Sequence, residues 1–249
     1  MNASTPYLLI SDLDDTLLGD DQALRRFHDF HRAECVDILG LIYASGRFAD
    51  SVRNDVFTTD LPEPLYIIGG VGSEIRGFKE DTAVKEWEEQ ISENWSAETV
   101  RQTLADMETI KLQPEENQSP FKVSYLYPNA TPDHLDRIRD RLQGAGLDIN
   151  LIYSSRRDLD ILPGGVDKGT AAKFITHRLG VPNDRVLTAG NSGNDINLME
   201  HGFHGIVVAN AHDKFRRCAK ENHRIYPSTQ EYADGVRDGV RYWLNRLES

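Results

Sequence analysis

The sequence has few cysteines and no long apolar segment. Cys35 and Cys218 are its only cysteines among 249 residues. Two are too few for a disulfide framework or a thiolate metal cluster, and we expect both to be small buried hydrophobic residues. No apolar run approaches the roughly 20 residues that cross a bilayer, and the N-terminus lacks the basic and apolar regions of a signal peptide. These absences predict a cytoplasmic protein.

Basic residues are also scarce relative to acidic ones. The chain has 28 lysines and arginines against 40 aspartates and glutamates, which gives a formal net charge of −12 and a pI of about 5.1. Such a surface repels nucleic acid and anionic membranes, so neither is expected as a partner. An anionic small molecule is still possible, because a local cation can outweigh the overall field. With 39% hydrophobic residues, the chain can bury the core of one large domain or of a domain with an insertion.

Short apolar runs recur in the N-terminal and C-terminal parts of the chain. Each run is followed by a glycine or a small polar residue and then by a helical pattern. This alternation predicts an α/β fold with a parallel sheet covered by helices. Ligands of such sheets bind at the carboxyl ends of the strands, so the polar residues after each run are the candidates for a site. The predicted strands span residues 7–10, 38–44, 66–68, 186–189 and 206–209, and a final amphipathic helix spans 230–248.

The middle of the chain breaks this alternation. Residues 78–162 predict a small inserted α+β domain, so the larger domain would comprise residues 1–77 and 163–249. Within the insertion we expect acidic helical segments at 82–95 and 97–109, a helix with Leu135, Ile138 and Leu142 on one side, and strands at 121–127, 149–155 and 157–162.

Three acidic residues follow the first predicted strand, in the sequence YLLISDLDDT. Asp12 and Asp14 are two positions apart, and such side chains project the same way from an extended backbone. Two neighbouring carboxylates resist joint ionisation, so either a cation joins them or one keeps its proton. The alternative is that these residues only form a turn or cap the next helix.

Polar groups also lie at the ends of three other predicted elements. Ser45 and Gly46 come after the second strand, where backbone amides can turn toward an anion. Lys168 opens a helix, where its charge opposes the helix dipole unless it serves an anion nearby. The strand at 186–189 leads into an all-oxygen cluster of the kind that suits Mg²⁺, formed by Asn191, Asn194 and Asp195.

The order D-L-D-D-T, S-G-R, K-G and G-N-S-G-N-D resembles the haloacid dehalogenase superfamily of phosphohydrolases, and the insertion resembles its type II cap domain. The segments GGVGSEI, WEEQISENW, PFKVSY, YSSRRDLDILP and ADGV are similar, in this order, to the sucrose-phosphate phosphatase family. The resemblance covers nearly the whole chain. It implies a Rossmann-like parallel sheet core with an inserted α+β cap that determines substrate specificity.

The resemblance also implies roles for the residues of the motifs. Asp12 would be the nucleophile that forms an aspartyl-phosphate, and Asp14 the acid and base. Ser45 and Lys168 would complete the catalytic group. The expected Mg²⁺ ligands are Asp12, Asp14 through its carbonyl, Asn191 and Asp195, with Asn191 standing where the family usually has an aspartate. The expected substrate-binding residues are Gly46, Arg47, Glu74, Lys122, Arg157, Asp158, Asp160 and Asn194.

The predicted activity is a Mg²⁺-dependent phosphoric monoester hydrolase of carbohydrate metabolism, acting on sucrose 6-phosphate in sucrose biosynthesis. The alternative substrate is mannosylfructose phosphate or another glycosyl-sugar or polyol phosphate, and the upstream synthase is a candidate partner. A phosphoaccepting signalling receiver is the non-enzyme alternative, although a receiver needs no inserted domain. A nucleotide-binding enzyme is a further alternative, because GGVGSEI is rich in glycine but lacks the full G-x-G-x-x-G pattern.

Overall fold

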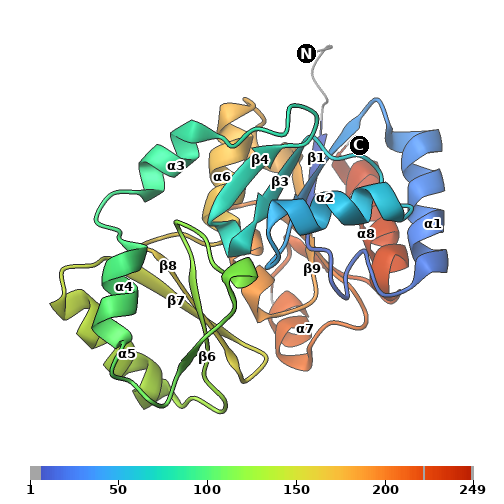
Figure 1. Cartoon of the computed structure of the whole chain (residues 1–249). Coiled ribbons are helices and arrows are strands. Elements are labelled where there is room, and N and C mark those ends of the chain that lie inside the picture. The colour runs from blue at the N-terminus through green and yellow to red at the C-terminus, as the bar shows by residue number, and fades with distance from the viewer. Residues whose placement is uncertain (1–6, 221, 248–249) are drawn as a thin grey trace. The chain divides into compact units, whose positions relative to one another are not determined.

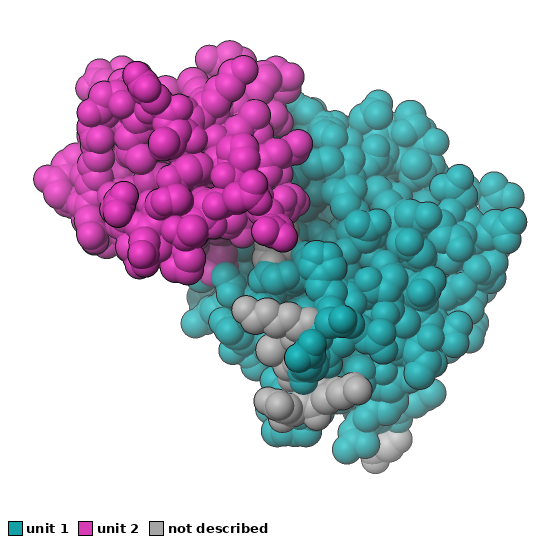
Figure 2. Space-filling view, turned by 90° about the horizontal axis from the view of Figure 1, so that it is seen from below, with its two compact units in different colours: residues 1–82, 168–249 teal, residues 83–167 magenta. Residues whose placement is uncertain are grey.

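The computed structural model describes residues 7–220 and 222–247, apart from the side chains of residues 194, 214, 218 and 220. The expectations for the side chains of Asn194 and Cys218 therefore lie outside the described residues. Two compact units are present, residues 1–82 with 168–249 and residues 83–167 (Figure 2). Both boundaries lie a few residues later than those expected from the sequence, 78 and 162.

The larger unit contains one seven-stranded sheet in the order β11-β10-β9-β1-β2-β3-β4 (Figure 1). β1 lies between β2 and β9 and pairs in parallel with both. Leu9 and Ile10 of β1 are fully buried, as expected for a strand covered on both faces. The strands span Tyr7–Ser11 (β1), Leu39–Ala44 (β2), Tyr66–Gly69 (β3), Glu74–Gly77 (β4), Val186–Gly190 (β9), His204–Val207 (β10) and Ile225–Pro227 (β11).

The glycine-rich segment after β3 forms a tight turn. Gly70, Val71 and Gly72 have positive φ angles of 55°, 62° and 102°, and β4 then returns antiparallel to β3. This segment leads into a strand, whereas a dinucleotide-binding loop leads into a helix. The nucleotide-binding interpretation of GGVGSEI is therefore wrong on structural grounds.

Helices cover the sheet of the larger unit. The final helix α8 packs on β9, β10 and β11 and beside α1, and Trp243 of α8 donates from Nε1 to the carbonyl of Gly205 in β10 at 3.0 Å. Within the described residues, no helix has the length and apolar character needed to cross a membrane. The helices span Asp21–Phe30 (α1), Ala49–Thr58 (α2), Lys168–Arg178 (α6), Asp213–Lys220 (α7) and Tyr232–Leu247 (α8), with a π-helical turn at His31–Cys35 and 3-10 segments at Gly70–Gly72, Asn183–Arg185 and Gly193–Met199.

The smaller unit has its own four-stranded antiparallel sheet in the order β5-β6-β8-β7. Helices α4 and α5 pack on this sheet, and Val123, Ile138 and Ile161 are fully buried in its hydrophobic core. The two acidic helices are shorter than expected. The elements span Lys85–Ile91 (α3), Ala97–Leu104 (α4), Lys111–Leu112 (β5), Glu115–Asn117 (a 3-10 turn), Val123–Leu126 (β6), Pro132–Gly144 (α5), Ile149–Ser154 (β7) and Asp158–Pro163 (β8).

Candidate active site

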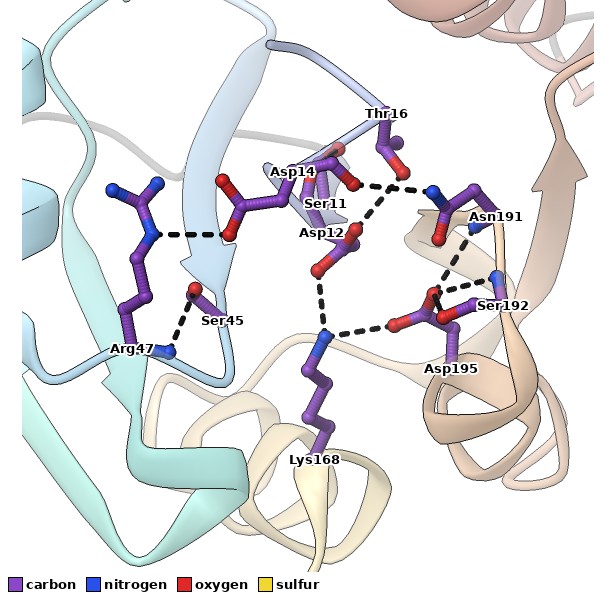
Figure 3. Close-up of polar contacts among 10 residues, drawn as sticks. All are labelled: Ser11, Asp12, Asp14, Thr16, Ser45, Arg47, Lys168, Asn191, Ser192 and Asp195. Carbon is purple, nitrogen blue, oxygen red and sulfur yellow. Dashed lines mark hydrogen bonds and ion pairs between the residues drawn. The ribbon is translucent and has the colours of Figure 1, made fainter. Parts of the chain in front are cut away.

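The centre of the site is a buried ionic cluster of Asp12, Lys168 and Asp195 (Figure 3). Asp12 follows β1, Lys168 begins α6, and Asp195 lies in the 3-10 segment after β9. Lys168 Nζ donates to Asp12 Oδ1 at 2.6 Å and to Asp195 Oδ1 at 2.8 Å. The side chains of Lys168 and Asp195 are fully buried, and that of Asp12 is 8% exposed. The fold thus brings together charged groups from distant parts of the sequence.

The pKa values of this cluster follow from burial and from its charges. Burial lowers the pKa of Lys168, but the attraction of Asp12 and Asp195 outweighs burial and raises that pKa above its ordinary value. Burial, followed by repulsion from Asp195, raises the pKa of Asp12 to about 7, although Lys168 and a hydrogen bond from Thr16 lower it. One ammonium group is therefore not enough to keep Asp12 as acidic as an exposed aspartate.

Asp14 turns away from Asp12, contrary to the expectation that both carboxylates face one space (Figure 3). β1 ends at Ser11, and the amides of Thr16, Leu17 and Leu18 all donate to the Leu13 carbonyl in a tight turn. The alternation of an extended strand does not apply there. Asp14 Oδ2 instead accepts a hydrogen bond from Arg47 Nε at 3.0 Å, and its side chain is 58% exposed.

Ser45, Gly46 and Arg47 follow β2 at the same edge of the sheet. Ser45 is fully buried, and its Oγ accepts a hydrogen bond from the Arg47 amide at 3.0 Å. The Arg47 guanidinium also forms an ion pair with Asp55 of α2, from Nη1 to Oδ2 at 2.7 Å. Arg47 was expected to bind substrate, and in this structure its side chain lies between Asp14 and Asp55.

The segment after β9 folds around Asp195. Asp195 Oδ2 accepts hydrogen bonds from the amides of Asn191 and Ser192, both at 3.1 Å. Asn191 Nδ2 donates to the Asp14 carbonyl at 3.2 Å, which connects this segment to the loop after β1. Four of the predicted ligand residues thus surround one small region of the larger unit, namely Asp12, Asp14, Asn191 and Asp195.

Oxygen atoms in this region could hold a divalent cation. The described residues contain no group of three or more histidine, cysteine, aspartate or glutamate side chains placed to bind a metal. The donors are instead mixed: the Asp12 carboxylate, the Asp14 carbonyl and, after rotation of the amide, the Asn191 side-chain oxygen. The Asn191 amide lies 3.2 Å from the Asp14 carbonyl, so rotation of this amide would place a second neutral oxygen donor beside that carbonyl, and Mg²⁺ prefers oxygen donors. The donor set therefore fits Mg²⁺, with fewer negative charges than an all-carboxylate site.

Glu74, a predicted substrate-binding residue, is engaged within the fold. Its carboxylate accepts a hydrogen bond from the amide of Ala49, the first residue of α2. A negative charge there is favourable for the helix dipole. Gly69 makes room for it, because a Cβ atom at Gly69 would lie 2.3 Å from Glu74 Oε1. This arrangement supports a structural role for Glu74.

The predicted sugar-binding residues of the smaller unit fall into two groups. Lys122 and Asp160 are buried, with Lys122 Nζ 3.6 Å from Asp160 Oδ1, and Ser124 Oγ donates to the same oxygen at 2.6 Å. Arg157 is largely exposed and forms an ion pair with Asp158 at 3.3 Å. The first group is a built polar cluster, whereas the second is an ordinary surface pair.

Sequence reasoning missed two residues of the larger site. Thr16 donates from its hydroxyl to Asp12 Oδ2 at 2.9 Å, and its signal was present, because it ends the D-L-D-D-T motif. Asp55, which holds Arg47, had no signal in the sequence, because its role depends on how α2 passes Arg47.

Comparisons with known proteins decide the family. The model of the Sucrose-6F-phosphate phosphohydrolase family matches residues 5–244. The chain belongs to this family. The predictions of a sucrose-phosphate phosphatase-like member of the haloacid dehalogenase superfamily and of a phosphoric monoester hydrolase are confirmed, and the receiver alternative is set aside.

Individual members of the family are similar over nearly the whole chain. The chain is 33% identical to the mannosylfructose-phosphate phosphatase of Agrobacterium fabrum, over 95% of this chain and 96% of that protein. It is 28% identical to sucrose-phosphatase 2 of Nicotiana tabacum over 95% of this chain, but spans only 59% of that protein's length. The solved sucrose-phosphatase of Synechocystis sp. PCC6803, in complex with sucrose and phosphate, has a TM-score of 0.86 and 31% identity, over 96% of this chain and 98% of the other. The fold expected from the sequence is thereby confirmed.

Proposed function

We propose that this protein removes phosphate from a phosphorylated disaccharide, with sucrose 6-phosphate as the first candidate and mannosylfructose phosphate as the alternative. The observation that carries the proposal is the buried cluster in which Lys168 joins Asp12 and Asp195. The similarity to a mannosylfructose-phosphate phosphatase and to a sucrose-phosphatase solved with sucrose and phosphate supports the substrate class.

Asp12 is the proposed nucleophile. Its Oδ atom attacks phosphorus, the bond from phosphorus to the sugar oxygen breaks, and the phosphoryl group is transferred to Asp12. Water then attacks the aspartyl-phosphate, releases inorganic phosphate and restores the carboxylate. The Ser45 hydroxyl and the Gly46 amide are proposed to hold phosphoryl oxygens, because both lie at the end of β2, which pairs with β1.

Charge is the main obstacle to this attack. A carboxylate and one phosphate charge repel by about 4 kcal/mol at 4 Å and an effective dielectric constant of 20. Lys168 offsets part of this repulsion from its fixed position beside Asp12. A Mg²⁺ ion held by the Asp12 carboxylate, the Asp14 carbonyl and the Asn191 amide oxygen would supply two further positive charges and lower the pKa of Asp12. Asp195 already accepts hydrogen bonds from Lys168 and from two backbone amides. Its main proposed role is therefore to position Lys168, and metal binding is a secondary role.

Asp14 is the proposed acid and base. A sugar alkoxide is a poor leaving group, so its oxygen needs a proton as the bond to phosphorus breaks. Asp14 delivers that proton and later accepts one from the attacking water. Its carboxylate is exposed and makes no contact with Lys168, which instead binds Asp12 and Asp195.

The smaller unit is proposed to supply sugar recognition. Lys122, Ser124 and Asp160 combine a cation, a hydroxyl and a carboxylate in one buried cluster. Such groups donate to and accept from sugar hydroxyls. Arg157, which is exposed, and Asp158, which is partly buried, offer a second pair of charged groups for the same purpose.

Replacement of the nucleophile tests the reaction. Asp12→Asn keeps the shape of the side chain but removes its charge, so phosphate release from sugar phosphates should fall by more than about a thousandfold, given the rate factors typical of covalent catalysis. Phosphate release is measured over many turnovers with purified protein, alongside circular dichroism to verify the fold.

Asp15→Asn is the matched control. Asp15 is the next acidic residue of the same loop, is exposed and has a φ angle of 57°, a conformation that asparagine also adopts readily. This variant should retain near-normal turnover. Near-normal turnover by Asp12→Asn would show that Asp12 is not the nucleophile.

A substrate screen tests the second part of the proposal. Phosphate release is compared for sucrose 6-phosphate, mannosylfructose phosphate, trehalose 6-phosphate and monosaccharide phosphates, each with Mg²⁺ present. A kcat/KM for one of the first two that is at least tenfold above the others is the expected result. Equal rates for all of them would overturn the assignment to disaccharide phosphates.

We also propose that the protein acts in the cytoplasm. The low cysteine content supports a reducing compartment, and Cys35 is buried and has no disulfide partner within the part of the chain that the structure describes. Localisation of a fluorescent fusion in the source cells is the test.

A further inference from the structure

Arg47 lies between two carboxylates outside the Lys168 cluster. Its Nε donates to Asp14 Oδ2 at 3.0 Å, and its Nη1 lies 2.7 Å from Asp55 Oδ2 and 3.4 Å from Ser51 Oγ. Figure 3 shows the Asp14 side chain extended toward Arg47 rather than toward Asp12. The position of the Asp14 carboxylate is therefore set by Arg47, and the position of Arg47 by α2.

Asp55 is poorly placed for the stability of its own helix. It lies in the last turn of α2, Ala49–Thr58, which has no basic residue there. A negative charge near a helix C-terminus is unfavourable for the helix dipole, typically by about 0.3–1 kcal/mol. The ion pair with Arg47 accounts for an acidic residue at this position.

Arg47 also leaves one buried donor without a partner. Its Nη2 is inaccessible to solvent and makes no hydrogen bond with any described residue. Leaving such a donor unsatisfied costs about 1–3 kcal/mol. The geometry instead favours the two contacts that Nε and Nη1 make with Asp14 and Asp55.

We propose that Asp55 and Arg47 are positioning residues for the proposed acid Asp14. Asp55 fixes the guanidinium, and the guanidinium fixes the position of the Asp14 carboxyl group, which in its protonated form gives a proton to the departing sugar oxygen and becomes a carboxylate. This inference rests on the proposed function and assigns Asp55, a residue without a motif, to the same site. A displacement of about 1 Å in such a group costs about a hundredfold in rate, so the loss of Asp55 affects the step that needs the proton.

The test compares two leaving groups. Asp55→Asn removes the ion pair and keeps the size of the side chain. The kcat/KM value covers only the steps up to departure of the leaving group, so the later attack of water does not enter. For the best sugar phosphate found in the screen, kcat/KM should fall by about 10–100-fold, within the range that general acid catalysis contributes. For p-nitrophenyl phosphate, whose phenolate leaves without a proton, the fall should be less than about threefold.

Two variants serve as controls. Asp50→Asn removes a more exposed ion pair of the same helix, to Arg76 at 3.1 Å, and should leave both kcat/KM values unchanged. Asp55→Glu restores the charge and should recover most of the activity toward the sugar phosphate. Arg47→Lys keeps the charge but loses the two-pronged geometry, so it should show the same selective loss as Asp55→Asn.

Equal losses for both substrates in Asp55→Asn, or no loss for either, would overturn the proposal. These results test only the role of Asp55, because the proposed function is tested separately by Asp12→Asn. If no disaccharide phosphate is turned over, the same comparison between any alkyl phosphate substrate and p-nitrophenyl phosphate still decides whether Asp55 supports Asp14.

Discussion

Among the side chains that the structure describes, each unit contains one buried lysine beside aspartate, and the two arrangements differ. In the larger unit Lys168 contacts the carboxylates of Asp12 at 2.6 Å and Asp195 at 2.8 Å, which are far apart in the sequence. In the smaller unit Lys122 faces Asp160 at 3.6 Å, and Ser124 hydrogen-bonds to the same oxygen. In the first cluster the lysine has a negative charge on each of two sides, which agrees with the proposed transfer of a phosphoryl group that all the candidate substrates share. In the second cluster the ion pair is longer and its carboxylate also accepts a hydrogen bond from a hydroxyl group, which agrees with the proposed recognition of sugar hydroxyls.

The largest expected difference between the two clusters is in stability. Lys168→Met leaves Asp12 and Asp195 buried without their cation, and an uncompensated buried charge costs about 3–5 kcal/mol. The melting temperature without divalent ions should therefore fall by about 10 °C, since 1 kcal/mol shifts it by about 2–4 °C in a chain of this size. Calorimetry measures this, and activity should be lost as well. A melting temperature within 2 °C of wild type would mean that one carboxylate is protonated and that the lysine is not needed for stability.

The corresponding substitution in the smaller unit should mainly weaken binding of the substrate. Lys122→Met removes an ion pair whose N···O distance, 3.6 Å, is longer than the two distances at Lys168, so the melting temperature should fall by less than in Lys168→Met. KM for the sugar phosphate should rise by about tenfold, the equivalent of about 1.4 kcal/mol, whereas kcat/KM for p-nitrophenyl phosphate should be unchanged. Steady-state kinetics with both substrates decides this.

Arg139→Met is the control for Lys122→Met. It removes an exposed ion pair with Asp136 on α5 of the same unit, and such pairs contribute about 0–1 kcal/mol. Its kinetics and melting temperature should match wild type. If Lys122→Met behaves in the same way as this control, the buried cluster of the smaller unit has no role in sugar binding.

The smallest expected effect concerns Asn191, which is neutral at a position of the proposed Mg²⁺ site where the family usually has an aspartate. Asn191→Asp should bind Mg²⁺ about tenfold more tightly, because a carboxylate attracts the ion more strongly than an amide. Without metal it should melt at a lower temperature than wild type, since the carboxylate would face the Asp14 carbonyl where the amide now donates a hydrogen bond. Calorimetric titration with Mg²⁺ and melting in EDTA measure the two effects.

Asn210→Asp is a closely matched control. Asn210 Nδ2 donates to the carbonyl of Asp15 at 2.8 Å, the residue next to Asp14, but Asn210 is not one of the expected ligands. Its substitution should change the melting temperature without changing Mg²⁺ affinity. Equal Mg²⁺ affinities in Asn191→Asp and wild type would exclude the Asn191 side chain from the metal site.

The strands of the larger unit and the polar residues that follow them were largely predictable, because apolar runs and the polar residues beside them can be recognised in short stretches of sequence. The apolar runs at β1, β2, β3 and β9 were located to within one or two residues, and the polar residues after them lie together. β4 was not predicted, because its direction depends on the positive φ angles of the turn before it.

The orientation of side chains within the site was less predictable. Asp12 and Asp14 were expected to face one space, but the strand ends before them and each has a different cationic partner. Glu74 was assigned to substrate because it lies at the entry to the insertion, whereas its contact with the N-terminus of α2 depends on three-dimensional packing. Asp55 could not be found at all, since no pattern in the sequence connects it to Asp14.

The central position of β1 has a consequence for the order in which the enzyme is made. One edge of β1 pairs with β2 soon after both strands leave the ribosome, but the other edge pairs with β9, which begins at Val186. The smaller unit is complete in sequence before then, at residue 167. During synthesis Asp12 lacks its ammonium partner until residue 168 is made, and β1 keeps an open edge until β9 is made, while the sheet of the smaller unit is already complete in sequence. Truncated chains that end before Val186 are thus expected to have a folded insertion and an aggregation-prone, inactive remainder.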